Sequence, residues 1–429
     1  MPDNITTVLG VKINNLKRTQ VLEKIKQFVT SQKPHQIVTV NAEFLVAAQN
    51  DPGFRMILHT ADLNTADGMG VLWAAKYLTL PITDLPLIKW LQSIWQLIYT
   101  GLAVVFYPSY IKTVIVEKIS GTDLIWDIAA LAEREGYRLF LLGGYENTPE
   151  LVKEKLLQKY PRLKIAGLYS GRPEEEGIVE KINQTKPDIL LVAFGPVRQE
   201  KWIAENLQKL RISAAIGLGG TFDYLAGKKP LAPHFLRSRG LEWAFRLITQ
   251  PYRIKRIYTA VIVFPWYCLL YKIQQTKPYR KNVVACVVND KNQILLCRRQ
   301  DENESGKEHW QLPQGGVDEN ETYEEALARE IKEETGLTHL TVLGKVLHAH
   351  HYDWPSTLAK KSYEGKYRGQ SQSIFYVRAD LKRDQIRLDH KEFNAYKWVN
   401  KEELINAVHP FRRTLAEKVI ENFDKFIKS

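Results

Sequence analysis

One pattern with fixed internal spacing, between residues 315 and 337, constrains the fold of this chain more than any other feature. Gly315 is separated from Glu321 by five residues, and seven more lead to the charged run Arg329–Gly336. The order of glycine, acid and arginine predicts a glycine loop that folds back on a helix. We expect Glu321 to pair with Arg329 and to hold the loop against that helix.

The charged run places three carboxylates on one face of the expected helix. Residues 323–335 are predicted to be helical, which sets Glu330, Glu333 and Glu334 at positions i, i+3 and i+4. Gly336 is of the type that ends a helix. Clustered carboxylates repel one another, and their hard oxygen atoms suit Mg²⁺ or Mn²⁺, which binds phosphate oxygens and activates water. The three glutamates are therefore the candidate metal ligands.

This pattern is a complete Nudix box, and a resemblance to Nudix hydrolases continues through Trp310–Gly316, Gly369–Gln372 and Glu392-Phe393. It covers nearly all of residues 282–427 and is nearest to bacterial RNA pyrophosphohydrolases and dinucleoside-tetraphosphate hydrolases. The resemblance implies an α/β/α domain that hydrolyses a phosphoanhydride. It also implies catalytic roles for Glu334 and Glu392 and substrate contacts for Arg298 and Gln370.

The substrate of this half stays open at the level of sequence. A dinucleoside polyphosphate and a 5′-triphosphate RNA end are the leading candidates, and a nucleoside-diphosphate sugar is an alternative. Residues 280–429 carry 25 basic and 24 acidic side chains. This balance does not give the excess of basic residues that is typical of an RNA-binding surface. A nucleotide sensor without activity is disfavoured because every carboxylate of the box is present.

The N-terminal part alternates short apolar runs with amphipathic stretches. Strands separated by helices are typical of a parallel α/β sheet. The predicted strands are Gln36–Val40, Arg138–Leu142, Asp188–Phe194 and Ala214–Leu218, with helices such as Pro149–Lys159 and Gln199–Leu210 between them.

Polar and glycine motifs follow these apolar runs, where α/β folds build their sites. They include Thr39–Ala42, Thr65–Val71, Ser120–Asp123, Gly195–Trp202, Gly217–Asp223 and Pro251–Arg253. In order and interval they resemble the WecG/TagA/CpsF glycosyltransferases over about residues 5–260, apart from one insertion. The resemblance implies a Rossmann-like domain that transfers an N-acetylmannosamine-type sugar from a UDP donor to a polyprenyl-diphosphate-linked acceptor, without an essential metal.

Sugar transfer needs a base for the acceptor hydroxyl and positive or N–H groups for the departing diphosphate. Asp67, in a glycine-flanked turn, is the candidate base, although it could instead cap the following helix. The candidate substrate-binding residues are Thr39 and Asn41, Lys118 where the family usually has arginine, Gln199 and Glu200 at a helix start, and Arg246, Arg253 and Arg256.

Two apolar segments indicate contact with a membrane. Trp90–Ile111 has no charged residue, and Ile257–Tyr271 follows three basic residues. The first lies between two motifs of one site, so it cannot cross a membrane once. It must dip in, lie in the interface, or pack inside as a hairpin, with Gly101 and Pro108 as candidate bends. Residues 1–279 carry 35 basic and 24 acidic side chains, which favours an anionic membrane surface.

We thus expect a two-enzyme chain that is cytoplasmic and peripheral on the inner face of the cell membrane. The predicted divisions are a glycosyltransferase domain (1–245, insertion about 81–117), a basic and apolar appendage (246–273), a linker (274–281) and a Nudix domain (282–429). Three unpaired cysteines and the absence of a signal-peptide pattern agree with a reducing cytoplasm. An inactive N-terminal membrane tether is the rival hypothesis, and assembly into a homo-oligomer is left open.

Overall fold

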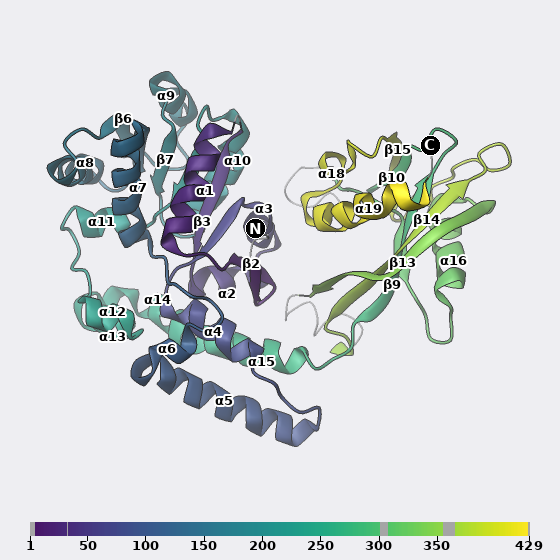
Figure 1. Cartoon of the computed structure of the whole chain (residues 1–429), viewed down its shortest axis with the longest axis horizontal. Helices are drawn as coiled ribbons and strands as arrows, with labels where there is room; N and C mark the ends of the chain where they lie inside the picture. Colours follow the sequence, from purple (N-terminus) through teal and green to yellow (C-terminus); the bar gives the residue numbers. More distant parts are fainter. Residues whose placement is uncertain (1–4, 32, 301–307, 355–364, 428–429) are drawn as a thin grey trace. The chain divides into compact units, whose positions relative to one another are not determined.

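The computed structural model describes residues 5–31, 33–300, 308–354 and 365–427. The chain divides into two compact units, Met1–Ile273 and Gln274–Ser429. Each unit has a β-sheet with helices packed on it (Figure 1). The predicted pair of α/β domains is confirmed.

The first unit is built on six parallel strands in the order β4-β3-β8-β7-β5-β6. Leu139 and Leu141 pack on one face under helices α1, α7 and α8, whereas Phe140 and Leu142 pack on the other against α9 and α10. Burial on both faces explains why the strands are continuous apolar runs. The strands are β3 (His35–Val40), β4 (Leu63–Ala66), β5 (Arg138–Gly143), β6 (Lys164–Tyr169), β7 (Ile189–Ala193) and β8 (Ala214–Gly217). The helices are α1 (Arg18–Thr30), α7 (Gly121–Glu135), α8 (Thr148–Lys159), α9 (Ile178–Thr185) and α10 (Arg198–Asn206).

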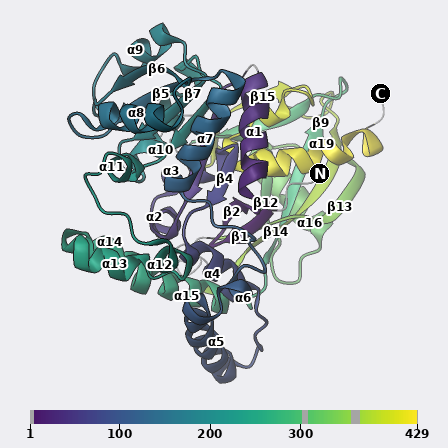
Figure 2. The ribbon, with the colours of Figure 1, turned by 60° about the vertical axis from the view of Figure 1, so that its left-hand side comes forward.

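The uncharged segment forms one long helix, α5 (Pro86–Phe106), followed by the short helix α6 (Pro108–Ile111). The chain turns at Pro108, whereas Gly101 lies inside α5. Figure 2 shows α5 at the edge of the unit, beside α4 (Met69–Thr79) and α6. Its outer side chains are exposed, with Leu87 at 74% and Phe106 at 79%. The outer face of α5 is therefore not packed inside the protein, which excludes an internal hairpin for the side chains of that face.

The second apolar segment continues a chain of helices: α12 (His234–Ser238), α13 (Glu242–Thr249), α14 (Ile254–Tyr258), the π-helix η3 (Thr259–Val263) and α15 (Phe264–Gln274). Within the described residues, one helical stretch, Pro251–Gln274, is long and apolar enough to cross a membrane by length and composition, and 39% of its apolar window is buried. The buried Lys272 of α15 fixes this stretch to the unit, because its ammonium donates to the carbonyls of Tyr77 and Leu80.

The second unit contains a mixed seven-stranded sheet in which β9 and β14 run parallel. Helix α16 (Tyr323–Thr335) covers one face and α19 (Arg413–Phe426) the other, which gives the predicted α/β/α sandwich. The strands are β9 (Arg280–Val288), β10 (Ile294–Arg299), β11 (Trp310–Gln311), β12 (Gln314–Gly316), β13 (Leu340–Asp353), β14 (Gly369–Ala379) and β15 (Phe393–Val399).

Strands β9 and β10 follow one another in the chain but do not form a regular hairpin. Strands β9 and β10 pair only at Val288 and Ile294. Beyond that point β12 occupies the edge of β9, and β10 pairs with β15 instead. The two sequence runs contain nothing that distinguishes these partners.

Candidate active sites

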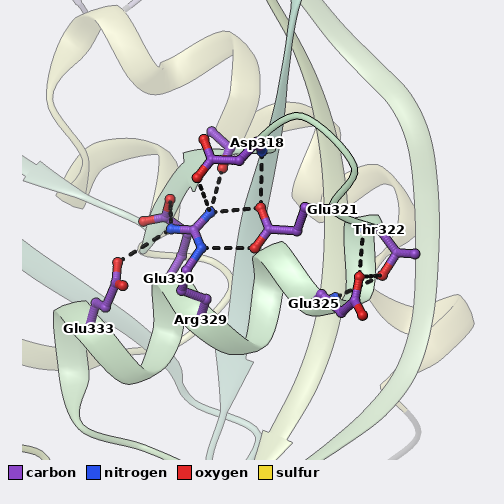
Figure 3. A network of polar contacts seen from close by, with 8 residues as sticks. Asp318, Glu321, Thr322, Glu325, Arg329, Glu330 and Glu333 are labelled. Carbon is purple, nitrogen blue, oxygen red and sulfur yellow. Dashed lines mark hydrogen bonds and ion pairs between the residues drawn. The ribbon is translucent and has the colours of Figure 1, made fainter.

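Arg329 is the centre of a polar network in the second unit (Figure 3). Its Nε and Nη2 donate to the two carboxylate oxygens of Glu321 at 2.8 and 2.9 Å. Its Nη2 also donates to the Gly316 carbonyl at 2.9 Å. The predicted Glu321–Arg329 pair is confirmed, and it holds the glycine loop against α16. These hydrogen bonds lower the pKa of the Glu321 carboxyl to about 2, so the pair stays charged around neutral pH.

The helix that carries this network begins and ends as the sequence predicts. Thr322 Oγ1 accepts the Glu325 N–H at 3.2 Å, and the Glu325 carboxylate accepts the Thr322 N–H at 2.8 Å, a reciprocal capping box. At the other end Gly336 has φ 73°, a left-handed conformation that glycine adopts without strain. Both ends of α16 are thereby fixed, and the glutamates between them keep their spacing.

The three predicted metal-binding glutamates have different surroundings. Arg329 Nη1 donates to Glu330 at 2.8 Å and to the exposed Glu333 at 3.3 Å. Glu334 is buried and accepts the Gln314 N–H at 3.1 Å. Burial raises the pKa of Glu334 well above its ordinary value, and the charge of Glu330 adds to that rise. Burial also raises the pKa of Glu330.

Within the described residues, no group of three His, Cys, Asp or Glu side chains is arranged to hold a metal ion, because Arg329 draws Glu330 and Glu333 toward itself. The donor set still fits a hard divalent cation. Glu334 is a buried carboxylate beside another carboxylate, and ionising both costs free energy that a cation would offset. A Cβ on Gly315 would lie 1.7 Å from the carboxyl carbon of Glu330, so only glycine lets Glu330 lie against this loop.

Glu392, predicted as a further carboxylate of this site, lies just before β15. Its charge raises the pKa of both Glu330 and Glu334, which places it near them. Asp389 was not predicted, and its Oδ1 accepts the Glu392 N–H at 3.0 Å. An acid three residues before Glu392 is the signal that marks such a turn.

The two predicted substrate contacts of this unit have partners inside the protein. Arg298 donates to Glu308 and to Asn394, each at 2.8 Å. Gln370 accepts the Tyr352 hydroxyl at 2.6 Å. None of these contacts involves the three box glutamates, so substrate binding by Arg298 and Gln370 stays a prediction.

The first unit contains a cavity of ≈ 490 Å³ at the carboxyl ends of β3, β4 and β8. In a parallel sheet this edge collects the side chains that follow neighbouring strands. Eight of the nine site residues predicted for this unit line the cavity: Thr39, Asn41, Asp67, Lys118, Gln199, Arg246, Arg253 and Arg256. The ninth, Glu200, does not.

Asp67 follows β4, and its carboxyl group faces this cavity. Asp67 is partly buried. This burial raises its pKa to about 7; among the neighbouring charges, Lys118 and Arg246 lower the pKa, and Glu242 and Asp123 raise it. Among the described residues, none donates a hydrogen bond to the carboxylate. The alternative role of Asp67 as a helix cap is wrong, because α4 begins after Gly68, which is its N-cap. A carboxyl group that titrates near neutral pH is suited to taking up a proton.

The prediction that Glu200 binds substrate is corrected by its position in the structure. It is fully buried, and its carboxylate accepts the Val197 N–H at 2.9 Å and the Gln199 side-chain amide at 2.7 Å. It therefore fixes the start of α10 rather than contacting a ligand. Gln199 in turn accepts the Gly219 N–H at 3.0 Å, which connects α10 to the turn after β8.

Two further predicted residues hold the cavity wall in place. The Thr39 hydroxyl donates to the Gly217 carbonyl at 3.2 Å. Asn41 accepts the Phe44 N–H at 3.0 Å and so caps α2 (Ala42–Asn50). Both also line the cavity, where they can contact a ligand.

The basic side chains around the cavity are held by acids and hydroxyls. Arg246 pairs with Glu242, Arg256 with Glu43 at 2.8 Å, and Arg253 donates to the Tyr224 hydroxyl at 3.2 Å. A further arginine, Arg237, pairs with Asp123 at 3.2 Å and was not predicted. It lies in the short helix α12, whose sequence has no marked pattern. Five cationic residues thus line the cavity together with three acids, of which Glu43 and Glu242 pair with arginines and Asp67, among the described residues, does not.

Family comparison decides the identity of the larger unit. The model of the glycosyl transferase WecG/TagA/CpsF family matches residues 6–98 and 84–278. The chain belongs to the WecG/TagA/CpsF family. The two matched ranges overlap at residues 84–98, which include the first part of α5. The NUDIX domain model matches residues 278–422, so the chain joins a WecG/TagA/CpsF glycosyltransferase to a Nudix hydrolase.

Relatives of the WecG/TagA/CpsF part include the N-acetylglucosaminyldiphosphoundecaprenol N-acetyl-beta-D-mannosaminyltransferase of two Staphylococcus aureus strains, NCTC 8325 and COL. Each is 26% identical over 273 residues, which is 63% of this chain and 92% of the relative. Solved structures similar to the Nudix part include a MutT protein from Methanosarcina mazei Go1 (25% identity, 35% of this chain and 98% of that chain, TM-score 0.26). A C. elegans Ap4A hydrolase has 22% identity, 34% and 99% coverage and a TM-score of 0.26.

Proposed function

We propose that the first unit transfers an N-acetylmannosamine-type sugar from a UDP donor to a polyprenyl-diphosphate-linked acceptor sugar. The observation that carries this proposal is the cavity in which Asp67, whose pKa is raised to about 7, is surrounded by Lys118, Arg237, Arg246, Arg253 and Arg256. A base and a set of cations are what transfer between two diphosphate-bearing substrates requires. The mannosaminyltransferase relatives support the choice of sugar and acceptor.

In this mechanism Asp67 takes the proton of an acceptor hydroxyl. The hydroxyl oxygen attacks the anomeric carbon of the donor, and the bond between that carbon and the UDP oxygen breaks. UDP leaves with the bonding electron pair, and the basic side chains stabilise its negative charge. Asp67 then releases its proton to water. Thr39 and Asn41 orient the sugars.

The second unit hydrolyses a phosphoanhydride in a nucleotide substrate, with dinucleoside polyphosphates and 5′-triphosphate RNA as its candidate substrates. Glu330, Glu333 and Glu334 would hold Mg²⁺ or Mn²⁺, which polarises phosphate oxygens and activates water. Arg329 donates hydrogen bonds to Glu330 and Glu333 on this face of α16. Glu392 adds a carboxylate that can act as a base.

A transfer assay with the full chain tests the proposal for the first unit. UDP-N-acetylmannosamine and a diphosphate-linked N-acetylglucosamine acceptor should give a disaccharide lipid, detected by mass spectrometry, together with stoichiometric UDP. Transfer should proceed in the presence of EDTA, because no metal is expected in this site. If UDP appears only by hydrolysis of the donor, or no product forms with any UDP-N-acetylhexosamine, the proposed transfer is wrong.

We also propose that the first unit lies on the membrane surface, with the outer face of α5 in the lipid. This face presents Leu91, Ile98 and Leu102, exposed by 61%, 49% and 56%. Further exposed apolar side chains occur on α12 and the helices after it: Phe235, Ile248, Tyr252, Ile254, Tyr258, Ile262 and Trp266. An apolar surface of this extent is typical of an interaction site, and lipid is the partner that matches a polyprenyl acceptor.

The full chain is expected to float with vesicles of anionic lipid. Substituting Leu91, Ile98 and Leu102 together with serine should lower the bound fraction at least about 10-fold, because each large apolar side chain contributes about 1.5–3 kcal/mol on full burial. Ile5→Ser changes an exposed apolar residue outside this surface and should float like the wild type. Equal flotation of the triple variant would contradict the proposed role of α5.

A further inference from the structure

The cavity of the first unit has two chemically different parts. One contains Asp67 and the cationic side chains. The other is apolar and lies between helices: Leu97, Gly101, Val104 and Val105 come from α5, Trp73 from α4, and Ile257, Ala260, Val261 and Pro265 from the run of helices α14, η3 and α15. The sugars, the ribose and the diphosphates of the two substrates are polar, and the polyprenyl chain of the acceptor is the part that is apolar throughout.

Helix α5 is built so that it can form such a wall. Its buried residues are polar, namely Ser93, Gln96 and Thr100, the reverse of a helix in a soluble protein. The indole of Trp73 donates to the Thr100 hydroxyl at 2.8 Å, and the Gln96 amide donates to the Pro81 carbonyl at 2.8 Å. These hydrogen bonds and the packing of Leu97, Ala103 and Val104 on the core hold the helix in place. Leu97, Val104 and Val105 also line the cavity, where they can contact a ligand.

Helix α5 leaves open space at one exposed position that lines the cavity. A Cβ placed on Gly101 would have no heavy atom within 4 Å, although Gly101 lines the cavity. Only one turn farther along, α5 is closely packed, because a Cβ on Gly240 would lie 2.5 Å from a methyl group of Val104. Across the cavity η3 is a π-helix, an uncommon form that often occurs at functional sites.

We propose that the apolar part of the cavity receives the first isoprene units of the lipid acceptor, with α5 and η3 as its two walls. This inference rests on the proposed transfer to a polyprenyl-diphosphate acceptor and adds a subsite that selects the lipid. The acceptor diphosphate lies at the arginines, and its chain runs from there between Gly101 and Val261. The wall on the α5 side comes from the uncharged segment Trp90–Ile111.

The subsite predicts a chain-length preference that Gly101→Leu removes. Acceptors with the same diphosphate-linked sugar are compared, one with a single isoprene unit and one with three. Gly101→Leu should lower the ratio of kcat/KM for the long acceptor to that for the short one by about 10-fold or more, because a misfit of one or a few methylenes in an apolar pocket changes kcat/KM about 10–200-fold. Val261→Phe, on the opposite wall, should lower the same ratio. Ser109→Leu, an exposed residue of α6 outside the cavity, should leave it as in the wild type.

A binding measurement makes the inference testable without catalysis. Farnesyl diphosphate should bind the wild-type full chain more tightly than methyl diphosphate, measured by calorimetry, and both cavity variants should lose that difference. An unchanged kcat/KM ratio and an unchanged binding difference in both variants would overturn the subsite. Absence of transfer by the wild type, together with preferential binding of farnesyl diphosphate, would overturn the proposed reaction and leave the lipid subsite supported.

Discussion

Asp67→Asn is expected to slow sugar transfer by about 10²–10⁴-fold, the range that a general base contributes. The amide keeps the shape of the side chain and cannot accept the proton of the acceptor hydroxyl. Affinity for the UDP donor should stay close to that of the wild type, because the cations that hold the diphosphate remain. Turnover and donor affinity are measured separately, by product formation and by calorimetry with UDP.

The pH dependence provides a second measurement on the same variant. Wild-type transfer should rise with pH through about 7, because the carboxyl group of Asp67 must lose its proton before it can act as a base. The residual activity of Asp67→Asn should lack this rise. A wild-type rate that is flat between pH 6 and 8 would remove Asp67 from the role of base, as would undiminished transfer by the variant.

Asp67→Asn should lower activity but raise the stability of the first unit. The folded-state pKa of Asp67 lies above its ordinary value of 3.8, so this residue destabilises the fold as pH rises from about 4 through 7. Asn has no such charge. Asp67→Asn should therefore raise the melting temperature at pH 8 by roughly 2–4 °C, equivalent to about 1 kcal/mol in a domain of this size, and the gain should vanish near pH 4.

Glu333→Gln combined with Glu334→Gln is expected to reduce Mg²⁺-dependent phosphoanhydride hydrolysis by at least about 10³-fold. Loss of single catalytic groups commonly costs 10²–10⁴-fold, and this double change removes two candidate metal ligands. The fold should be kept, because the buried Glu334 carboxyl, with its raised pKa, opposes folding at neutral pH. Hydrolysis of a dinucleoside tetraphosphate measures the effect.

The matched control is Glu324→Gln, on the same helix. Glu324 pairs with Lys345 at 2.6 Å on an exposed surface, and its substitution removes one charge without touching the three box glutamates. It should hydrolyse the substrate like the wild type, and sugar transfer should be unchanged in all these variants. Full hydrolysis by the double variant would exclude the box glutamates from catalysis.

Patterns of spacing predicted the local structure well. The limits of α16, its glycine end and the Glu321–Arg329 pair follow from the residues alone, and so does the strand that precedes Gln199. These features depend on periodicity and on short-range geometry, which a single sequence records. The strand before Asp67, β4, was not among the predicted strands.

Features that depend on tertiary partners could not be predicted in the same way. By residue type and position, Glu200 could equally be a site residue. Only its buried hydrogen bond with the Val197 N–H shows that it holds the start of α10. The apolar residues of α5 indicate a hydrophobic segment but do not say which face is outside. The small polar residues at Ser93, Gln96 and Thr100 could have given that answer, since their spacing of three and four places them on one face.

The proposed position of the outer face of α5 in the lipid has a consequence for the acceptor concentration that governs the rate of transfer. A protein whose acceptor and anchoring face share one bilayer meets its substrate in two dimensions, so the relevant quantity is the mole fraction of acceptor in the lipid. Adding plain vesicles at constant total acceptor would then slow transfer by surface dilution, although the bulk concentrations of enzyme and acceptor stay the same. The soluble nucleotide substrate of the Nudix unit would not be diluted in this way.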